Sequence, residues 1–191
     1  YSYTQLKNPT PYDYFIRLSD SFIHGKVYLT DHPAWLNELI PTSDPNKYYV
    51  AYPPMPAIIA TPFVVLNIAN KSQTFIAVLF GSINAAALYL VLKRLYSYRT
   101  SVLGALLLAF GTNHWYLATE GSSWYIAHII AVFFQLMAFL LIFKKSEDEK
   151  LVFATTHWRW LTAGLCIGAA YWSRLPAVLI APFFGLIPLA Q

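Results

Sequence analysis

Long apolar stretches without charge constrain this chain more than any other feature. Thr74–Leu92 contains no Asp, Glu, Lys or Arg over 19 residues, and Trp124–Phe143 contains none over 20. A helix that crosses a bilayer needs roughly 20 predominantly apolar residues. The chain is 57% hydrophobic and only 12% charged, whereas soluble domains are about 25% charged. The sequence therefore predicts an all-α integral membrane protein, a polytopic bundle of transmembrane helices.

Three further segments complete the expected bundle, which occupies residues 71–191. Thr100–Ala118 carries one histidine, Thr156–Trp172 begins with aromatic residues suited to the interface, and a fifth span starts at Leu175. The chain begins on Tyr1 and ends directly after an apolar run. We therefore expect a fragment of a longer protein.

The segment Pro54–Ala69 is apolar but has only 16 residues, and several prolines interrupt it. Pro62 would remove a helical hydrogen bond and break the helix. Runs this short are often re-entrant or interfacial. We predict that residues 54–70 do not span the membrane and that residues 1–53 form an external loop. If the segment did span, that loop would lie on the opposite side.

Charge in the loops predicts the orientation. Residues 93–99 and 144–159 together carry seven Lys and Arg, whereas residues 117–123 carry none and contain one acid, Glu120. By the positive-inside rule, the basic loops face the cytoplasm and Glu120 faces outward, together with the N-terminal region. Arg174, at the next outer turn, is an exception to the rule.

A short helix is expected near the N-terminus. Thr10 is suited to its N-cap, Pro11 to its first position and Asp13 to its third, while Gly25 is a natural stop. One face would carry two carboxylates, a guanidinium and an imidazole, on Asp13, Arg17, Asp20 and His24. The opposite face would be apolar, with Tyr14, Phe15, Leu18 and Phe22.

Such an amphipathic helix is suited to lying on a membrane surface. Ordinary structural roles also explain its polar face. Asp13 can complete a capping box, and Asp13–Arg17 and Asp20–His24 are i,i+4 pairs of common surface type. Tyr48, Tyr49 and Tyr52, which precede Pro53, are consistent with an interfacial belt or with a surface on which a sugar stacks.

Several classes of site find no support. A single cysteine, Cys166, excludes a disulfide framework and a cysteine-based zinc site. His114 and His128 lie in expected spans, where a lone histidine more often makes an interhelical hydrogen bond than binds a metal. The scattered basic residues build no nucleic-acid surface. The glycines Gly81, Gly164 and Gly168 indicate close helix contacts.

Four motifs, in chain order, carry a resemblance to a known family. They are YFIRLSDSFIHGK at 14–26, KYYVAYPPMPA at 47–57, GTNHWY with EGSSWY at 111–125, and AGLCIGAA with SRLP at 163–176. In this order they resemble glycosyltransferases of the GT-C fold. The most similar members are protein-mannosyltransferase-like and aminoarabinose-transferase-like bacterial membrane proteins.

The resemblance implies a hexosyl or pentosyl transferase of a bacterial cytoplasmic (inner) membrane. Such enzymes transfer a sugar from a polyprenyl-phosphate carrier to an acceptor on the external face, using a carboxylate in the first external loop. Asp13 would be the base, Asp20 the alternate base, and Glu120 a partner acid that orients the acceptor or a metal ion. A solvated loop residue is the alternative reading of Glu120. Relatives often have two acids where this chain has Asp13. They also have a preceding span and a C-terminal part, which we expect to be missing from this fragment.

A second group of residues is expected to bind the substrate. Arg174 is the main candidate for binding the lipid phosphate, because guanidinium binds phosphate bidentately; contact with external headgroups is the alternative. Arg17 is a second phosphate candidate, and His24, Tyr49 and Tyr52 are candidates for binding the sugar. The expected partners are the polyprenyl-phosphate-linked sugar and membrane lipid, without nucleic acid. The sequence identifies no cofactor, a divalent metal ion stays open, and the sugar and acceptor are not defined.

Two other functions are consistent with the sequence. A transporter or lipid-flipping protein would place polar residues near mid-membrane, where this chain has little beyond Asn84, His128 and Gln135. An inactive scaffold of the same fold is the third reading, because the first helix offers a single acid at its start.

Overall fold

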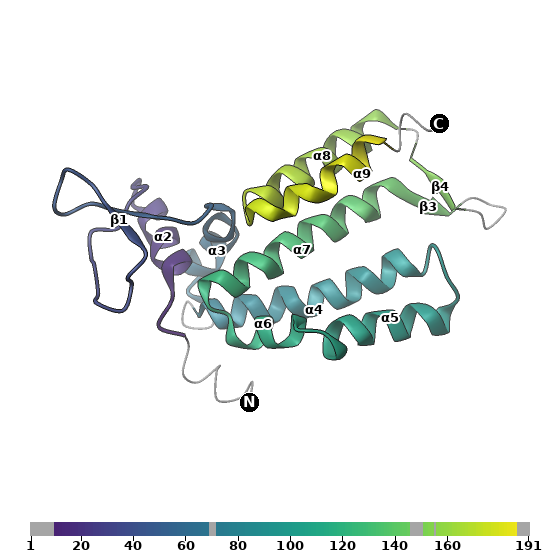
Figure 1. The fold of residues 1–191 in the computed structure, drawn as a ribbon, viewed down its shortest axis with the longest axis horizontal. Coiled ribbons are helices and arrows are strands. Elements are labelled where there is room, and N and C mark those ends of the chain that lie inside the picture. The colour runs from purple at the N-terminus through teal and green to yellow at the C-terminus, as the bar shows by residue number, and fades with distance from the viewer. Residues whose placement is uncertain (1–9, 69–71, 146–150, 155, 187–191) are drawn as a thin grey trace.

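The computed structural model describes residues 10–68, 72–145, 151–154 and 156–186. These residues are mostly helical, with two small antiparallel hairpins that pair β1 (Leu39–Pro41) with β2 (Tyr48–Val50) and β3 (Phe143–Lys145) with β4 (Leu151–Phe153). The molecule is elongated (Figure 1). The N-terminal region lies at one end of a helical bundle, and β3 and β4 lie at the other.

Two central helices form the frame of the bundle. α4 (Gln73–Leu92) and α7 (Ser123–Ile142) have 20 residues each and mean hydropathies of 2.2 and 2.3. They are long and apolar enough to cross a membrane, as the sequence predicted for these two segments. They pack side by side, and Asn84 Nδ2 on α4 donates a hydrogen bond of 2.9 Å to the Ile129 carbonyl on α7.

The expected continuous helix over Thr100–Ala118 is wrong. α5 (Tyr98–Gly111) ends early, Thr112 is extended, and a short helix α6 (His114–Glu120) follows. The local cause is the Thr112 hydroxyl, which accepts a hydrogen bond of 3.1 Å from the His114 N–H. Threonine thus offers the backbone a partner outside the helical ladder.

The remaining apolar segments form helices shorter than a typical span. α8 (His157–Tyr171) has 15 residues, and a turn at 172–174 leads to a 3₁₀ segment η2 (Leu175–Ile180) and to α9 (Ala181–Leu186). α3 (Met55–Val65) has 11 residues. Its length agrees with the short segment expected there, but the helix continues through Pro62 instead of breaking at it.

The N-terminal helix α2 (Tyr14–Ile23) starts later than expected. Asp13 is its N-cap rather than its third residue, and no side-chain capping bond forms. Thr10 caps nothing; its hydroxyl accepts a hydrogen bond of 3.3 Å from the Tyr12 N–H. The expected stop is confirmed, because Gly25 has a φ of 68° just beyond the helix.

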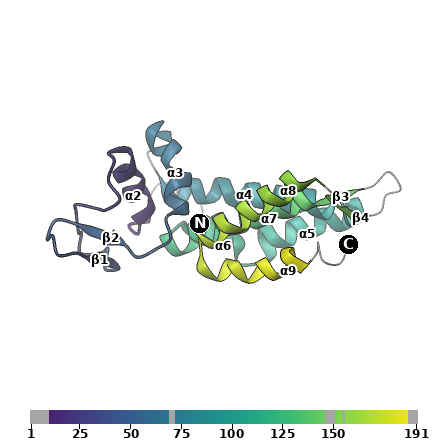
Figure 2. The same cartoon turned by 90° about the horizontal axis from the view of Figure 1, so that it is seen from above.

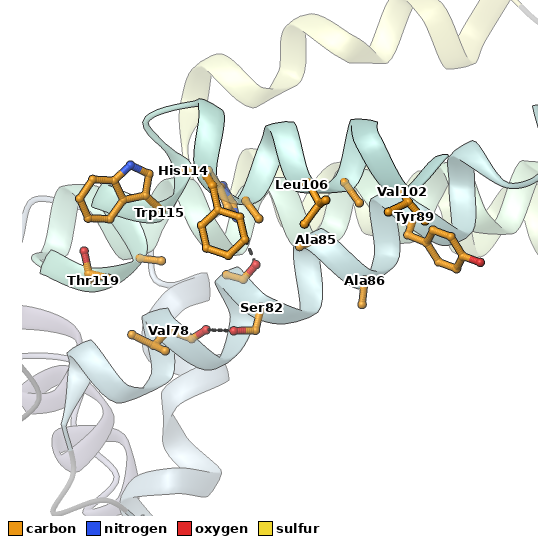
Figure 3. Close-up of a pocket in the computed structure, with 15 residues that line it drawn as sticks. Val78, Ser82, Ala85, Ala86, Tyr89, Val102, Leu106, His114, Trp115 and Thr119 are labelled. Atoms are coloured by element: carbon orange, nitrogen blue, oxygen red, sulfur yellow. Dashed lines mark hydrogen bonds between the residues drawn. The ribbon is translucent and has the colours of Figure 1, made fainter. Parts of the chain in front are cut away.

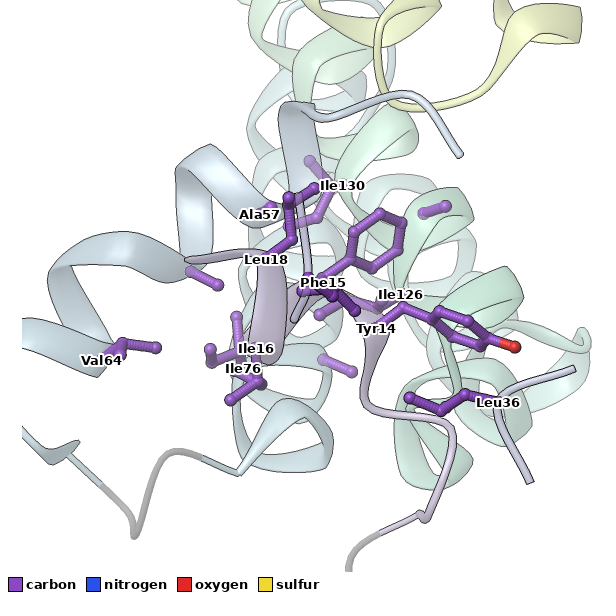
Figure 4. Packing of buried hydrophobic residues seen from close by; sticks show 14 of the residues in the cluster. Tyr14, Phe15, Ile16, Leu18, Leu36, Ala57, Val64, Ile76, Ile126 and Ile130 are labelled. Carbon is purple, nitrogen blue, oxygen red and sulfur yellow. The ribbon is translucent and has the colours of Figure 1, made fainter. Parts of the chain in front are cut away.

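The apolar face of α2 packs against protein (Figure 4). Tyr14, Phe15 and Leu18 are buried in one core cluster with residues of α3, α4 and α7, among them Ala57, Ile76, Ile126 and Ile130. Burial of this face corrects the expectation that it rests on the membrane surface. The second core cluster joins α4, α7, α8 and α9 toward the other end of the bundle.

The glycines differ in their role. A Cβ built on Gly81 would lie 2.7 Å from the Ala118 Cβ, so this glycine permits close approach of α4 and α6, as expected. Gly164 and Gly168 have no described heavy atom within 4 Å of such a Cβ. The expectation that these two mark a close helix contact is therefore wrong.

Candidate functional site

The predicted catalytic acids and Arg174 belong to segments at the same end of the bundle. Asp13 precedes α2, Glu120 ends α6 just before α7, and Arg174 follows α8. Figures 1 and 2 show these three chain segments near the N-terminal region. The Met55 N–H also donates a hydrogen bond of 3.1 Å to the Trp172 carbonyl, which connects α3 to the turn that carries Arg174.

Gln73, at the start of α4, ties two of these segments together. Its Oε1 accepts a hydrogen bond of 3.3 Å from the Phe15 N–H, and its Nε2 donates to the carbonyls of Tyr12 at 3.1 Å and Gly121 at 2.7 Å. The side chain is buried, with 1% exposed. Ser123 Oγ donates a further bond of 2.8 Å to the Tyr12 carbonyl. Gln73 was not a candidate from the sequence; the signal was a polar residue at the first position of an apolar helix.

Asp13 belongs to an ion-pair network. Arg17 Nε donates to Asp13 Oδ1 at 2.8 Å, and Arg17 Nη1 donates to Asp31 Oδ2. Burial lowers the pKa of Arg17, but the bonds and charges of Asp13 and Asp31 outweigh burial and leave its pKa raised. Arg17 is thus engaged by two carboxylates, which weakens its case as a phosphate ligand. Asp31 was missed in the sequence because it comes from a separate loop.

Asp20 and His24 lie further along α2. Their side chains are 49% and 64% exposed, and His24 Nδ1 is 3.8 Å from Asp20 Oδ2 but 2.8 Å from the Asp20 carbonyl oxygen. Asp20 follows Asp13 by seven positions, a rise of about 10 Å along the helix. Asp13 therefore lies at the end of α2 that Gln73 binds, and Asp20 lies further along the helix.

Arg174 lies against the start of α7. Its Nη1 donates a hydrogen bond of 3.0 Å to the Trp124 carbonyl, and burial lowers the pKa of Arg174. The Trp124 ring in turn packs on Tyr12, with 5.3 Å between ring centroids. Trp124 therefore connects Arg174 to the residue that precedes Asp13.

The two tyrosine candidates differ in access. Tyr49, on β2, is 45% exposed. The Tyr52 ring packs against three aromatic rings, with centroid distances of 5.5 Å to Tyr14, 6.1 Å to Phe15 and 6.3 Å to Trp124. Tyr49 is available for stacking on a ligand, whereas Tyr52 is part of the aromatic packing beneath the site.

Glu38 is a further acidic residue in this region that the sequence did not single out. Its N–H donates a hydrogen bond of 3.1 Å to Tyr14 Oη. Burial raises the pKa of Tyr14; the backbone bond from Glu38 lowers it, and the Glu38 charge raises it again. Glu38 Oε2 and Tyr52 Oη are both buried, and neither has a hydrogen-bond partner in the part of the chain that the structure describes. An unpaired buried polar group costs about 1–3 kcal/mol, so both atoms carry unused hydrogen-bonding capacity next to Tyr14.

Glu120 is fixed through its backbone. It is the last residue of α6, and its carbonyl accepts a hydrogen bond of 3.2 Å from Thr74 Oγ1. Gly121 follows with a φ of 64°, and a Cβ there would lie 2.5 Å from the Thr74 Cα. This close turn sets where the Glu120 side chain leaves the bundle. Among the described residues, no group of three or more His, Cys, Asp or Glu could hold a metal ion.

An apolar groove of about 530 Å³ lies between α4, α5 and α6 (Figure 3). Small and apolar side chains form most of its wall, and His114 is one of the lining residues, with Nε2 3.3 Å from the Gly81 carbonyl oxygen. In Figure 1, α4 and α5 lie on one side of α7, and α8 with the turn to Arg174 lies on the other. The groove is therefore separate from Arg174.

Comparison of the chain with family models, with curated proteins and with solved structures finds no match. The likeness to GT-C glycosyltransferases thus depends on the four motifs and their order.

Proposed function

We propose that this chain is part of a GT-C-type glycosyltransferase that transfers a sugar from a polyprenyl-phosphate carrier to an acceptor on the external face of a membrane. One observation carries the proposal: Trp124 binds Arg174 through its carbonyl and packs its ring on Tyr12, beside Asp13. A cation suited to phosphate and a carboxylate suited to base catalysis are thus connected through one residue.

In the proposed reaction, an oxygen nucleophile of the acceptor attacks the anomeric carbon of the sugar. The bond from that carbon to the carrier phosphate breaks, and the polyprenyl phosphate leaves with the electron pair. Asp13 accepts the acceptor's proton through Oδ2, because Arg17 engages Oδ1. The charge on the leaving phosphate is stabilised by Arg174.

The remaining residues have supporting roles in this proposal. Arg17 and Asp31 hold the Asp13 carboxylate in one orientation, which general base catalysis requires. Glu120 orients the acceptor from the neighbouring turn. Tyr49 stacks its exposed ring on the sugar.

The test uses the full-length protein in membranes, with a panel of polyprenyl-phosphate-linked hexoses and pentoses as donors. Release of polyprenyl phosphate is measured. Removing a general base typically costs 10²–10⁴-fold in rate, so we expect Asp13→Asn to lose about 100-fold or more at normal expression. Asp44→Asn is the matched control, because Asp44 lies in the same N-terminal region but pairs with Lys47. We expect it to keep full activity.

Two results would overturn the proposal. A wild-type protein that consumes none of the donors would remove the transfer reaction. Full activity in both Asp13→Asn and Asp20→Asn would remove α2 as the source of the base.

Topology gives an independent test, because the site requires Asp13, Glu120 and Arg174 on the outer side. With Cys166 replaced by serine, single cysteines are placed at the exposed positions Ser43 and Tyr96. We expect a membrane-impermeant reagent added from outside to label Ser43→Cys and to leave Tyr96→Cys unlabelled. The reverse pattern would place the site in the cytoplasm and contradict an external transfer.

A further inference from the structure

Two arginines converge at the end of the bundle opposite the candidate site. Arg94 follows α4, and Arg159 lies in the first turn of α8. Arg94 Nη1 and Arg159 Nη2 both donate to the Leu140 carbonyl near the end of α7, the latter at 3.4 Å. Arg94 also donates to the Phe143 carbonyl. Two guanidinium groups therefore share one carbonyl oxygen.

This arrangement places like charges together without a compensating acid in the described part of the chain. The six acidic residues that the structure describes lie in the N-terminal region or, as Glu120, at the turn between α6 and α7. The carbonyls at the end of a helix carry about half a negative charge in total. They offset only part of two full positive charges.

Two further observations indicate that the pair has unused capacity for an anion. Arg159 Nε is buried and has no hydrogen-bond partner among the residues that the structure describes. Burial and then the charge of Arg159 lower the pKa of Arg94, which reflects the same repulsion. An anion that accepts from both guanidinium groups would relieve both the unpaired donor and the repulsion.

We propose that Arg94 and Arg159 form a phosphate-binding site whose ligand is the headgroup of an anionic membrane lipid. Guanidinium binds phosphate oxygens bidentately, and it is more weakly hydrated than an ammonium group. The exposed Trp158 lies next to Arg159 in sequence, at the start of α8. Indole rings favour the headgroup level of a membrane, so the site lies where a lipid phosphate is present.

The experiment uses the purified full-length protein in a neutral detergent. Phosphatidylglycerol, phosphatidylcholine and inorganic phosphate are titrated separately, and the shift of the thermal unfolding midpoint gives an apparent affinity. We expect phosphatidylglycerol to raise the midpoint at lower concentrations than phosphatidylcholine. If inorganic phosphate raised the midpoint as much as phosphatidylglycerol does, and saturably, the ligand would be a free anion, and the proposal of a lipid headgroup would be overturned.

Variants test the two arginines against general electrostatics. We expect Arg94→Gln/Arg159→Gln to weaken phosphatidylglycerol binding about tenfold or more, since hydrogen bonds to charged groups are strong. Lys93→Gln/Arg99→Gln removes the same charge from exposed positions of the same basic end and should bind as the wild type. Equal losses in both double variants, or no loss in the first, would overturn the proposal.

Two controls separate folding and local competition from binding. Arg159→Lys keeps the charge and removes Nε. If the double variant fails to fold, weaker phosphatidylglycerol binding by a folded Arg159→Lys protein still supports the site. Phosphatidylglycerol affinity equal to that of the wild type would overturn the proposal. Glu147→Gln/Asp148→Asn/Glu149→Gln removes three acids outside the described residues. We expect this variant to bind phosphatidylglycerol at least as tightly as the wild type, and loss of binding would contradict the proposal. The transfer reaction plays no part in this test.

Discussion

Replacing Gln73 with leucine tests how the candidate site is held together. Leucine is close to glutamine in size but makes no hydrogen bonds. The change leaves the Phe15 N–H and the Gly121 carbonyl without the partner that Gln73 provides, whereas the Tyr12 carbonyl keeps the bond from Ser123. Each unsatisfied buried group costs about 1–3 kcal/mol. We therefore expect Gln73→Leu to lower the free energy of unfolding by about 2–6 kcal/mol.

Gln135→Leu is the matched control. Gln135 lies on α7, is half-buried, and donates one bond of 3.3 Å to the Ala177 carbonyl. The loss of one such bond costs about 0.5–1.5 kcal/mol. Denaturant unfolding in detergent gives the two free energies, and hydrogen exchange at the Phe15 amide shows whether the start of α2 opens locally. Equal destabilisation by the two variants, with unchanged exchange at Phe15, would refute the role assigned to Gln73.

Two further predictions concern packing and charge. Gly81→Ala forces a Cβ to within 2.7 Å of the Ala118 Cβ and should lower the free energy of unfolding by about 1–3 kcal/mol. We expect a second change, Ala118→Gly, to restore stability in the double variant. Gly164→Ala adds its Cβ in open space, so we expect it to leave stability unchanged. Unfolding midpoints of the three variants check this, and a Gly164→Ala loss as large as that of Gly81→Ala would contradict it. Hydrogen bonds from Lys47 Nζ and then from the Asn46 N–H lower the pKa of Asp44, so their stabilising effect is present at neutral pH and is lost as pH falls through that lowered pKa. NMR titration should show the pKa of Asp44 rising toward 3.8 in Lys47→Ala, and an unchanged value would contradict the assignment.

The two long helices were predictable because the length of an uncharged run is itself the constraint. α4 and α7 occupy Thr74–Leu92 and Trp124–Phe143 to within a residue at each end. The division between α5 and α6 was not predicted, since Thr100–Ala118 was assessed as one apolar run with a single histidine. At the division, the backbone N–H of His114 donates a hydrogen bond to the Thr112 hydroxyl, a local contact that hydropathy does not register.

The amphipathic character of α2 was predictable from the sequence, but whether its apolar face contacts lipid or protein was not. Burial of an apolar face stabilises by a similar amount per unit area against lipid or protein. The sequence of α2 therefore cannot distinguish the two. For the candidate site, the polar residues of α2 were found from their spacing, whereas Gln73, Asp31 and Glu38 come from distant segments that only the folded chain brings to α2.

The hydrogen bonds of Tyr12 also have a consequence for the order of assembly. Its carbonyl binds Ser123, which lies 111 residues later in the chain. At about 5–20 residues per second, a ribosome needs roughly 6–22 seconds to synthesise that interval. Until α7 is made, Tyr14, Phe15 and Leu18 lack the partners that Ile126 and Ile130 provide, and we expect the membrane surface to hold α2 in the meantime. Docking of the first helix would then be a late step, and a nascent chain that stops before Ser123 would contain α4 and α5 without an assembled site.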